Sequence, residues 1–493
     1  MFLRDFVKKS HLKQKQVEKS DIIGLTNEKK SYIIITVRKG DRKMLIDFKV
    51  SNFRSFEDIQ TFSMRAGKVR SFSDRLYGGK NIKLLKFMAI YGANASGKSN
   101  LVEALEFAQS VVVEGIPTNS ANFCCRLSEE NKNNATMFEF TIELWGKQFR
   151  YGFQVLLNKS GFVSEWLHEL TYNDKHKVIF NRDIVHGAFL VDEYFKDASI
   201  NERLKIYAED IKTDDSVLFL SLMNQNKDSL YASNEELKIY KAIFNWFKYK
   251  LSVNSPDRPI TSYSSLLDND SIQEISNMLS LFGTGVSHFN LSDVPLEKLI
   301  NSVTKELMKD ITDHLTEQRK RLEEKNISQK PTLMLRHPIE NIIFILELDD
   351  NNELHAKTLQ FSHNNTDALF SLNEESDGTV RLLDLIEVLL TAEKGKVYVI
   401  DEINRRFHPL LTYKFIEKYL ELANEREVQL IVTTHESKIM DFDLLRKDEI
   451  NFVNKNKYGR SEVYSLERFG ERFDKKISLA YLKGEYGAIP IFE

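Results

Sequence analysis

Three groups of residues in the sequence have the types and spacing of a nucleoside triphosphate site. The first is the run Gly92-Ala93-Asn94-Ala95-Ser96-Gly97-Lys98-Ser99, a complete GxxxxGK[ST] pattern. Its two glycines let the backbone curl so that N–H groups face phosphate oxygens, and the helix that must follow presents its positive N-terminal end. Lys98 is expected to reach the β- and γ-phosphates, and the Ser99 hydroxyl to bind Mg²⁺. The pattern predicts a nucleotide site at residues 92–99.

The second group consists of two acids and a histidine at the ends of later apolar runs. Asp401 and Glu402 directly follow the run 397–400, and His435 follows the run 428–434. Asp401 is expected to bind the metal ion, and Glu402 to polarise the water that attacks the γ-phosphate. His435 is expected to sense that phosphate, because α/β sheets bind ligands at the carboxyl ends of their strands. The alternatives are two solvated acids that end a strand, and a histidine that is simply packed or solvated.

The third group is Ser376-x-Gly378, which comes directly before an amphipathic pattern at residues 380–390. A Ser-x-Gly at a helix N-terminus is a second anion site. A single chain that binds one nucleotide does not need two phosphate-binding sites. A dimer needs both if Ser376 and Gly378 of each chain cover the triphosphate held by the other chain. The alternative is an ordinary cap, in which Ser376 or Thr379 accepts hydrogen bonds from helix N–H groups.

These residues require strands and helices that bring them together. The runs 86–91, 397–400 and 428–434 are short and apolar, which is typical of strands buried on both faces of a parallel sheet. Leu101 and Leu105 begin an apolar stripe at helical spacing directly after the glycine-rich loop. The order of strand, loop and helix predicts an α/β fold.

The long separation between Lys98 and Asp401 predicts an insertion in this fold. The stretches 234–249 and 296–325 have helical periodicity, whereas 137–180 reads as a meander of strands that belongs with the nucleotide-binding part. The predicted units are a basic leader at 1–43, an N-terminal lobe at 44–194, a mainly helical insertion at 195–335 that serves as an arm, a lid or a docking surface, and a C-terminal lobe at 336–493.

The composition of the 493 residues is that of a globular protein, with 42% hydrophobic and 29% charged residues. No apolar run approaches the ~18 to 20 residues that span a bilayer, and the N-terminus lacks the apolar core of a secretory signal, so we expect a cytoplasmic protein without membrane contact. Residues 1–43 hold 12 Lys and Arg against 5 Asp and Glu, and the remainder has a net charge of −10. Nucleic-acid binding is possible, but this charge does not support it.

The order and spelling of the motifs resemble the ABC-type ATPase heads of SMC, RecF and OLD proteins. The similarity includes Asn52-Phe53-Arg54-Ser55-Phe56, and is closer to the single-chain "AAA family" ATPases of prokaryotic anti-phage defence and abortive infection in the runs at 375–379, 408–409, 433–435 and 481–490. The resemblance covers about residues 44–493 and implies an ABC-type P-loop head, with ATP and Mg²⁺ as ligands and dimerisation of the heads around ATP. It also implies that Arg54 lies near the nucleotide. One departure is Asp377, where transporter-type heads have glycine.

Two functions are consistent with this resemblance. In the first, the ATPase senses a signal and regulates a separate effector, for example a nuclease encoded by a neighbouring gene. In the second, a RecF-like or SMC-like ATPase acts on DNA in repair or recombination. The negative charge of residues 44–493 favours the first. A guanine-specific enzyme is disfavoured because the sequence has no NKxD motif.

Overall fold

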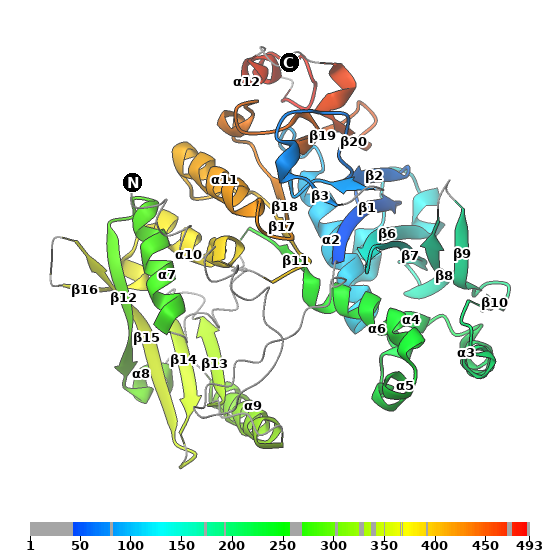
Figure 1. The fold of residues 1–493 in the computed structure, drawn as a ribbon, viewed down its shortest axis with the longest axis horizontal. Helices are drawn as coiled ribbons and strands as arrows, with labels where there is room; N and C mark the ends of the chain where they lie inside the picture. Colours follow the sequence, from blue (N-terminus) through cyan, green and yellow to red (C-terminus); the bar gives the residue numbers. More distant parts are fainter. Residues whose placement is uncertain are drawn as a thin grey trace, which may run out of the picture. The chain divides into compact units, whose positions relative to one another are not determined.

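A computed structural model describes residues 43–78, 82–171, 175–191, 194–256, 269–300, 304–324, 330–336, 342–349, 351–364, 366, 368–390, 393–470 and 476–490. The predicted leader at 1–43 lies outside these residues except for Lys43, and the structure does not test it. The fold described below is that of the chain from Lys43 onwards (Figure 1). Within the described residues, no helix is both long enough and apolar enough to cross a membrane.

A six-stranded sheet carries the motifs predicted to bind nucleotide. In spatial order its strands are β11 (Leu251–Asn254), β17 (Lys396–Ile400), β18 (Val428–Thr433), β5 (Phe87–Tyr91), β19 (Ile450–Lys455) and β20 (Ser461–Ser465). The first five are parallel, and β20 pairs with β19 in an antiparallel hairpin. The predicted α/β fold is confirmed, and the three strands predicted from their apolar runs are neighbours in this sheet.

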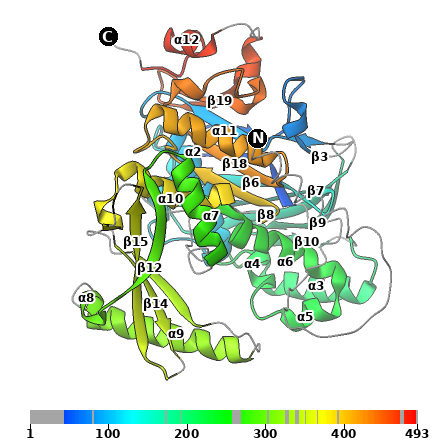
Figure 2. The same ribbon diagram turned by 60° about the vertical axis from the view of Figure 1, so that its left-hand side comes forward.

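Both faces of this sheet are buried, which explains why its central strands are mostly apolar. On β5, Met88 and Ile90 face one hydrophobic core, whereas Phe87, Ala89 and Tyr91 face another. The first core contains the apolar side of α2 (Lys98–Glu114), as the helical stripe predicted. The second contains residues of α7 (Asn269–Leu281), α10 (Asp377–Leu390) and α11 (Pro409–Ala423), which lie together in Figure 2.

An antiparallel sheet of seven strands shares the first core with α2. Its order is β10 (Ala188–Leu190), β9 (His176–Asp183), β8 (Gly161–Leu170), β7 (Lys147–Leu156), β6 (Thr136–Leu144), β1 (Lys43–Ser51) and β2 (Gln60–Ser63). Strands β6 to β10 are consecutive in sequence and in space, so the meander predicted at 137–180 is present. The short hairpin of β3 (Tyr77–Gly78) and β4 (Lys83–Leu84) packs against β1.

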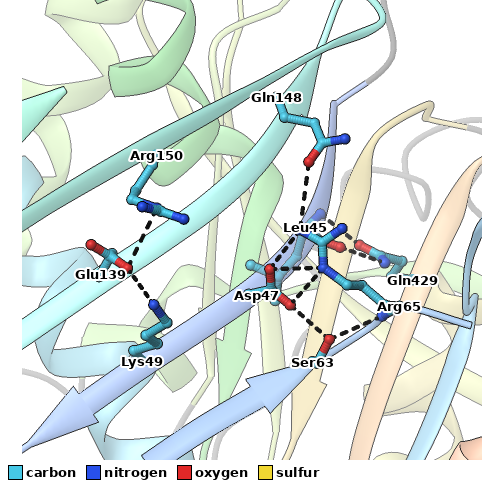
Figure 3. Close-up of polar contacts among 9 residues, drawn as sticks. All are labelled: Leu45, Asp47, Lys49, Ser63, Arg65, Glu139, Gln148, Arg150 and Gln429. Carbon is cyan, nitrogen blue, oxygen red and sulfur yellow. Dashed lines mark hydrogen bonds and ion pairs between the residues drawn. The ribbon is translucent and has the colours of Figure 1, made fainter. Parts of the chain in front are cut away.

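Gln429 of β18 connects the two sheets. Its side-chain oxygen accepts from the Leu45 N–H at 2.8 Å, and its Nε2 donates to the Leu45 carbonyl at 3.0 Å (Figure 3). The same Nε2 also donates to the Leu85 carbonyl at 3.1 Å. The Gln429 side chain is fully buried, so its hydrogen bonds are made inside the core. Beside this contact, Asp47 of β1 binds the guanidinium of Arg65. The bonds of Gln429 fix β1 next to the strand that leads to His435.

The predicted insertion contains the expected helices and also strands that the sequence did not predict. Its first part holds α3 (Ala198–Ile211), α4 (Phe219–Met223), α5 (Asp228–Ser233) and α6 (Lys238–Asn245), and then β11 of the six-stranded sheet. Its second part holds α7, α8 (Leu296–Ile300) and α9 (Lys305–Glu324), with β12 (Val286–Val294) and β13 (Thr332–Arg336). Strand β12 escaped prediction because small polar residues such as Ser287 and Ser292 interrupt its apolar pattern.

Strands β12 and β13 belong to a third sheet, which extends into the predicted C-terminal lobe. Its order is β12, β15 (Leu354–His363), β14 (Ile343–Leu348) and β13, and β16 (Leu369–Ser371) pairs with β15. One face packs on α8 and α9, and the other on α7 and α10 (Figure 2). The described chain ends with the hairpin β19–β20 and the short helix α12 (Ile477–Leu482).

Candidate functional site

The glycine-rich loop connects β5 to α2, as its sequence predicts. Gly97 has φ 112°, and a Cβ at this position would lie 2.5 Å from the Ser461 hydroxyl and 2.8 Å from that of Ser55. A Cβ on Gly92 would lie 2.4 Å from the Val453 carbonyl oxygen. Both glycines are therefore required by close neighbours, and Gly97 also by its backbone conformation. The loop has the form of a P-loop directly before a helix N-terminus.

Lys98 is buried at the base of this loop. Its Nζ donates to the carbonyls of Gly92 at 2.8 Å and Ala93 at 3.0 Å. Burial lowers the pKa of Lys98 to about 8, against the opposing effect of Asp401 and Glu402. Because an incoming phosphate stabilises the protonated amine, bound nucleotide should restore the charge that burial disfavours.

Asp401 and Glu402 are held by the neighbouring strands at the end of β17. The Asp401 N–H donates to the Asn254 carbonyl of β11 at 3.0 Å, and its carboxylate accepts from the Thr433 hydroxyl at 2.5 Å. The Glu402 N–H donates to the same Thr433 oxygen at 2.8 Å, with Glu402 in the left-handed region at φ 51°. This backbone conformation is uncommon for a residue with a Cβ and often marks a functional position.

His435 begins the loop after β18. The side-chain oxygen of Asn404 accepts from the His435 N–H at 3.3 Å and from the Thr434 hydroxyl at 3.0 Å. Burial and the charge of Lys98 lower the pKa of the imidazole, and Asp401 opposes them. His435 is therefore neutral at neutral pH, and its ring can donate one hydrogen bond to a phosphate oxygen.

A single cavity of about 490 Å³ brings most of the predicted residues together. It is lined by residues 94–100, Glu402, His435 and Lys455. Gly92 and Ala93 lie behind it as acceptors for Lys98, and Asp401 is buried beside Thr433. The described residues thus combine a phosphate cradle, a carboxylate and an imidazole at the carboxyl ends of parallel strands, where α/β folds bind ligands.

The residues predicted to bind metal have a suitable chemistry for Mg²⁺. Ser99 is exposed in the cavity and offers a hydroxyl, and Asp401 offers a carboxylate. Hydroxyl and carboxylate oxygens are ligands that Mg²⁺ accepts together with phosphate oxygens and water. These two side chains would hold the ion, which would neutralise phosphate charge when bound.

The pKa of Lys98 leads to a pH prediction. We expect ATP affinity to fall as the pH rises through about 8, because the free protein then loses the charge of Lys98 and must take up a proton to bind phosphate. One unit above this pKa the loss should be about tenfold. Isothermal titration calorimetry between about pH 7 and 9 measures it, and Lys98→Arg should remove the dependence because guanidinium stays charged. An equally steep dependence in Lys98→Arg would contradict the assignment.

Arg54, placed near the nucleotide by resemblance, lies beside the main cavity rather than in it. Its Nε and Nη2 each donate to the Glu103 carboxylate of α2 at 2.7 Å, and Nη1 donates to the Asn122 carbonyl at 2.9 Å. The guanidinium also lies over the Phe123 ring. Arg54 lines an adjacent cavity of about 320 Å³, which shares Asn100 and Lys455 with the first.

Ser376 and Gly378 lie at the start of α10 and line neither cavity. The Ser376 hydroxyl accepts from the Thr379 N–H at 3.1 Å, and its carbonyl accepts from the Val380 N–H at 3.0 Å. Ser376 therefore caps the helix, as the alternative interpretation held. The Asp377 side chain is 78% exposed, so this end of the helix remains open to a second molecule. A role across two chains stays a prediction.

Sequence reasoning missed several residues that shape the site. Thr433 and Asn404 hold Glu402 and His435, and Ser461 donates to the Ser96 carbonyl of the P-loop at 2.6 Å. Asn404 could have been suspected, because it follows the Asp-Glu pair by two residues. Lys455 and Ser461 belong to no motif. The pairing of β19 with β5 brings Lys455 to the loop, and the pairing of β20 with β19 brings Ser461 there.

Comparison with known families assigns the chain. Residues 87–441 match the family described as "AAA domain, putative AbiEii toxin, Type IV TA system". Because the match covers most of the sequence, the chain belongs to this family of AAA ATPase domains. The matched region includes the P-loop, the Asp-Glu pair and His435. A comparison with curated proteins found no match.

Solved structures of SMC head domains were also compared with the chain. An SMC head bound to the C-terminal winged-helix domain of ScpA is 13% identical, with a TM-score of 0.37 over 86% of this chain and 97% of that one. The SMC head domain of Thermotoga maritima is 12% identical, with a TM-score of 0.30 over 86% and 98%. The SMC head of Pyrococcus furiosus with an extended coiled coil, bound to the C-terminal domain of ScpA, is 14% identical, with a TM-score of 0.33 over 90% and 100%.

Proposed function

We propose that this chain binds ATP with Mg²⁺ in the P-loop cavity and hydrolyses it to ADP and phosphate. The observation that carries the proposal is the convergence of the P-loop, Glu402 and His435 on one cavity. Membership of an AAA domain family supports it. Phosphate release from ATP by the purified chain tests it, and no release above that of a chain lacking Lys98 would contradict it.

Each residue has a defined task in this proposal. Lys98 and the N–H groups of the loop hold the β- and γ-phosphates, while Ser99 and Asp401 hold Mg²⁺. Glu402 accepts a proton from the attacking water, and the hydrogen bonds around Thr433 keep its backbone in place. The neutral imidazole of His435 donates a hydrogen bond to the γ-phosphate and so responds to its presence.

We further propose that two chains associate head to head around ATP. Ser376 and Gly378 of one chain would then cover the γ-phosphate in the P-loop cavity of the other. The exposure of Asp377 and the absence of Ser376 and Gly378 from the described lining of their own chain's cavity support this arrangement. The helix N-terminus would supply donors and a positive potential to the phosphate.

A mixing experiment tests the shared site. Ser376→Arg should prevent the two chains from closing around ATP but leave its own P-loop able to bind ATP. Lys98→Ala should lose ATP binding in its own P-loop but keep an intact Ser376 for the other chain. Neither variant alone should hydrolyse ATP. A mixture should recover activity up to half of wild type, because a mixed dimer contains one site with an intact Lys98 and an intact Ser376.

Subunit exchange must be shown separately, for example by energy transfer between two labelled chains. A matched control is Ser233→Arg, which places the same side chain at the exposed end of α5, a helix that lines neither cavity, and should leave hydrolysis intact. No recovery despite exchange would mean that Ser376 is only a helix cap. The shared site would then be rejected, while hydrolysis by Glu402 would stand.

The biological role that we propose is control of a separate effector in anti-phage defence. The family description names a putative toxin and a toxin–antitoxin system, which supports a role in partnership with a second protein. Co-purification of the tagged chain with the products of neighbouring genes tests it. The alternative is an SMC-like or RecF-like ATPase that acts on DNA. Strong stimulation of hydrolysis by DNA, without a bound protein partner, would favour that alternative.

A further inference from the structure

The hairpin of β19 and β20 forms one wall of the nucleotide cavity. Strand β19 pairs with β5 in parallel, so its end lies beside the P-loop that follows β5. The hairpin is anchored there, because the Ser461 hydroxyl donates to the Ser96 carbonyl and lies 2.7 Å from the Ser55 hydroxyl. The Asn100 side chain of α2 donates to that same Ser55 oxygen at 2.6 Å. The end of the hairpin therefore has a defined position relative to the loop.

Lys455 is the last residue of β19 and stands at the junction of two cavities. It lines the P-loop cavity together with residues 94–100, and it also lines the adjacent cavity of about 320 Å³. Asn100 is the other described residue that the two cavities share. The Lys455 side chain is exposed, and it makes no ion pair with the residues that the structure describes. Its charge is available to a ligand that passes from one cavity into the other.

The second cavity is positively charged and has a mixed surface. Arg54, Arg126 and Lys455 line it, and none of its described lining residues carries a carboxylate. Arg54 is neutralised by Glu103, whereas Arg126 donates only weakly to Asn122, at 3.4 and 3.5 Å. Leu127 adds apolar surface next to the planar guanidinium of Arg126. A planar base can stack on such a surface, and the positive charge suits the phosphate that is attached to a nucleoside.

From this geometry we propose that the Lys455 amine contacts the phosphate of the bound nucleotide that is attached to the nucleoside. We also propose that the nucleoside occupies the cavity lined by Arg126 and Leu127. The inference rests on the proposed ATP binding, and it identifies a contact that no sequence motif marks. Lys98 would hold the β- and γ-phosphates, and Lys455 would hold the inner phosphate. A nucleoside triphosphate would thus extend across both cavities, with Asn100 beside the junction.

Isothermal titration calorimetry with two probes, ATP and inorganic tripolyphosphate, tests this assignment. Lys455→Ala should weaken both ligands about tenfold, because a charge-assisted hydrogen bond to phosphate is lost in each case. Arg126→Ala should weaken ATP but leave tripolyphosphate within twofold, because only ATP has a nucleoside. Lys455→Arg should retain most of the affinity of the wild type for both ligands.

Lys457→Ala is the matched control. It removes the same charge two residues further along the hairpin, where the amine lies over the Tyr458 ring and the side chain lines neither cavity. Its affinities should equal those of the wild type, and thermal melting should show that both lysine variants are folded. If Lys455→Ala binds both probes as tightly as Lys457→Ala, the assignment is wrong.

The other outcomes separate this inference from the proposed function. Loss of ATP affinity in Lys455→Ala without loss of tripolyphosphate affinity would reject the phosphate contact. If Lys455→Ala binds ATP and tripolyphosphate as the wild type does while Lys98→Ala no longer binds ATP, the role of Lys455 is rejected and the proposed ATP binding stands. Failure of the wild-type chain to bind ATP would overturn both proposals together.

Discussion

Replacement of Glu402 with Gln is expected to reduce ATP hydrolysis by at least about 100-fold while ATP still binds. General-base catalysis contributes about this much or more, and glutamine has the shape of glutamate but cannot accept the proton. The backbone of Glu402 is held by Thr433 and by its left-handed conformation, so the substitution should not displace neighbouring groups. Phosphate release measures hydrolysis, and calorimetry of ATP binding measures affinity.

The same variant tests the head-to-head association. ATP that is bound but not hydrolysed should keep two chains together, so mass photometry should show a larger species that depends on ATP. Glu425→Gln is a suitable control, because it removes an exposed acid near the end of α11 and should behave as wild type. Hydrolysis at the wild-type rate in Glu402→Gln would exclude Glu402 as the base. The absence of an ATP-dependent larger species would contradict the proposed dimer.

Replacement of Lys98 with Ala is expected to weaken ATP binding by about 100-fold. The amine is the main cation of the P-loop cavity, and a buried hydrogen bond between charged groups contributes about 3 kcal/mol at the upper end of the usual range. Calorimetry with ATP measures the loss. Lys414→Ala, which removes an exposed lysine of α11 that pairs with Glu417, is the control and should bind ATP normally.

Protein stability must be measured alongside this variant, because Lys98 is buried and donates to two carbonyls. Burial lowers its pKa, which means that the folded protein holds this charge at a cost in free energy. Its removal should therefore leave the melting temperature close to that of the wild type. Unchanged ATP affinity in a folded Lys98→Ala protein would refute the P-loop assignment.

The parts of the fold that could be predicted are those with a local signal. Strands β5, β17 and β18 are buried on both faces, so each is a mostly apolar run, and a glycine-rich loop, an acidic pair or a histidine follows within two residues. The hydroxyls and amides that support the site have no such signal. Thr433 contacts Glu402 across adjacent strands, and Lys455 reaches the cavity only through the pairing of β19 with β5. Strand pairing of this kind is a property of the folded chain.

The positions of Arg54 and Ser376 also depend on contacts that have no local signal in the sequence. Resemblance implies that Arg54 lies near a nucleotide, and the structure places Arg54 in the lining of the adjacent cavity, where we propose that the nucleoside lies, with its guanidinium bound to Glu103. Ser376 caps its own helix, and a contact with another chain cannot be read from the sequence or from one chain. The mixing experiment tests whether Ser376 contacts the nucleotide of a second chain.

The position of β11 matters for the design of shortened versions of this protein. Residues 195–335 interrupt the two nucleotide-binding lobes in sequence and would be the obvious block to delete, yet Leu251–Asn254 form an edge strand of the six-stranded sheet. Their removal would expose the backbone edge of β17 and take away the Asn254 carbonyl that accepts from Asp401. A shortened version should therefore keep Leu251–Asn254.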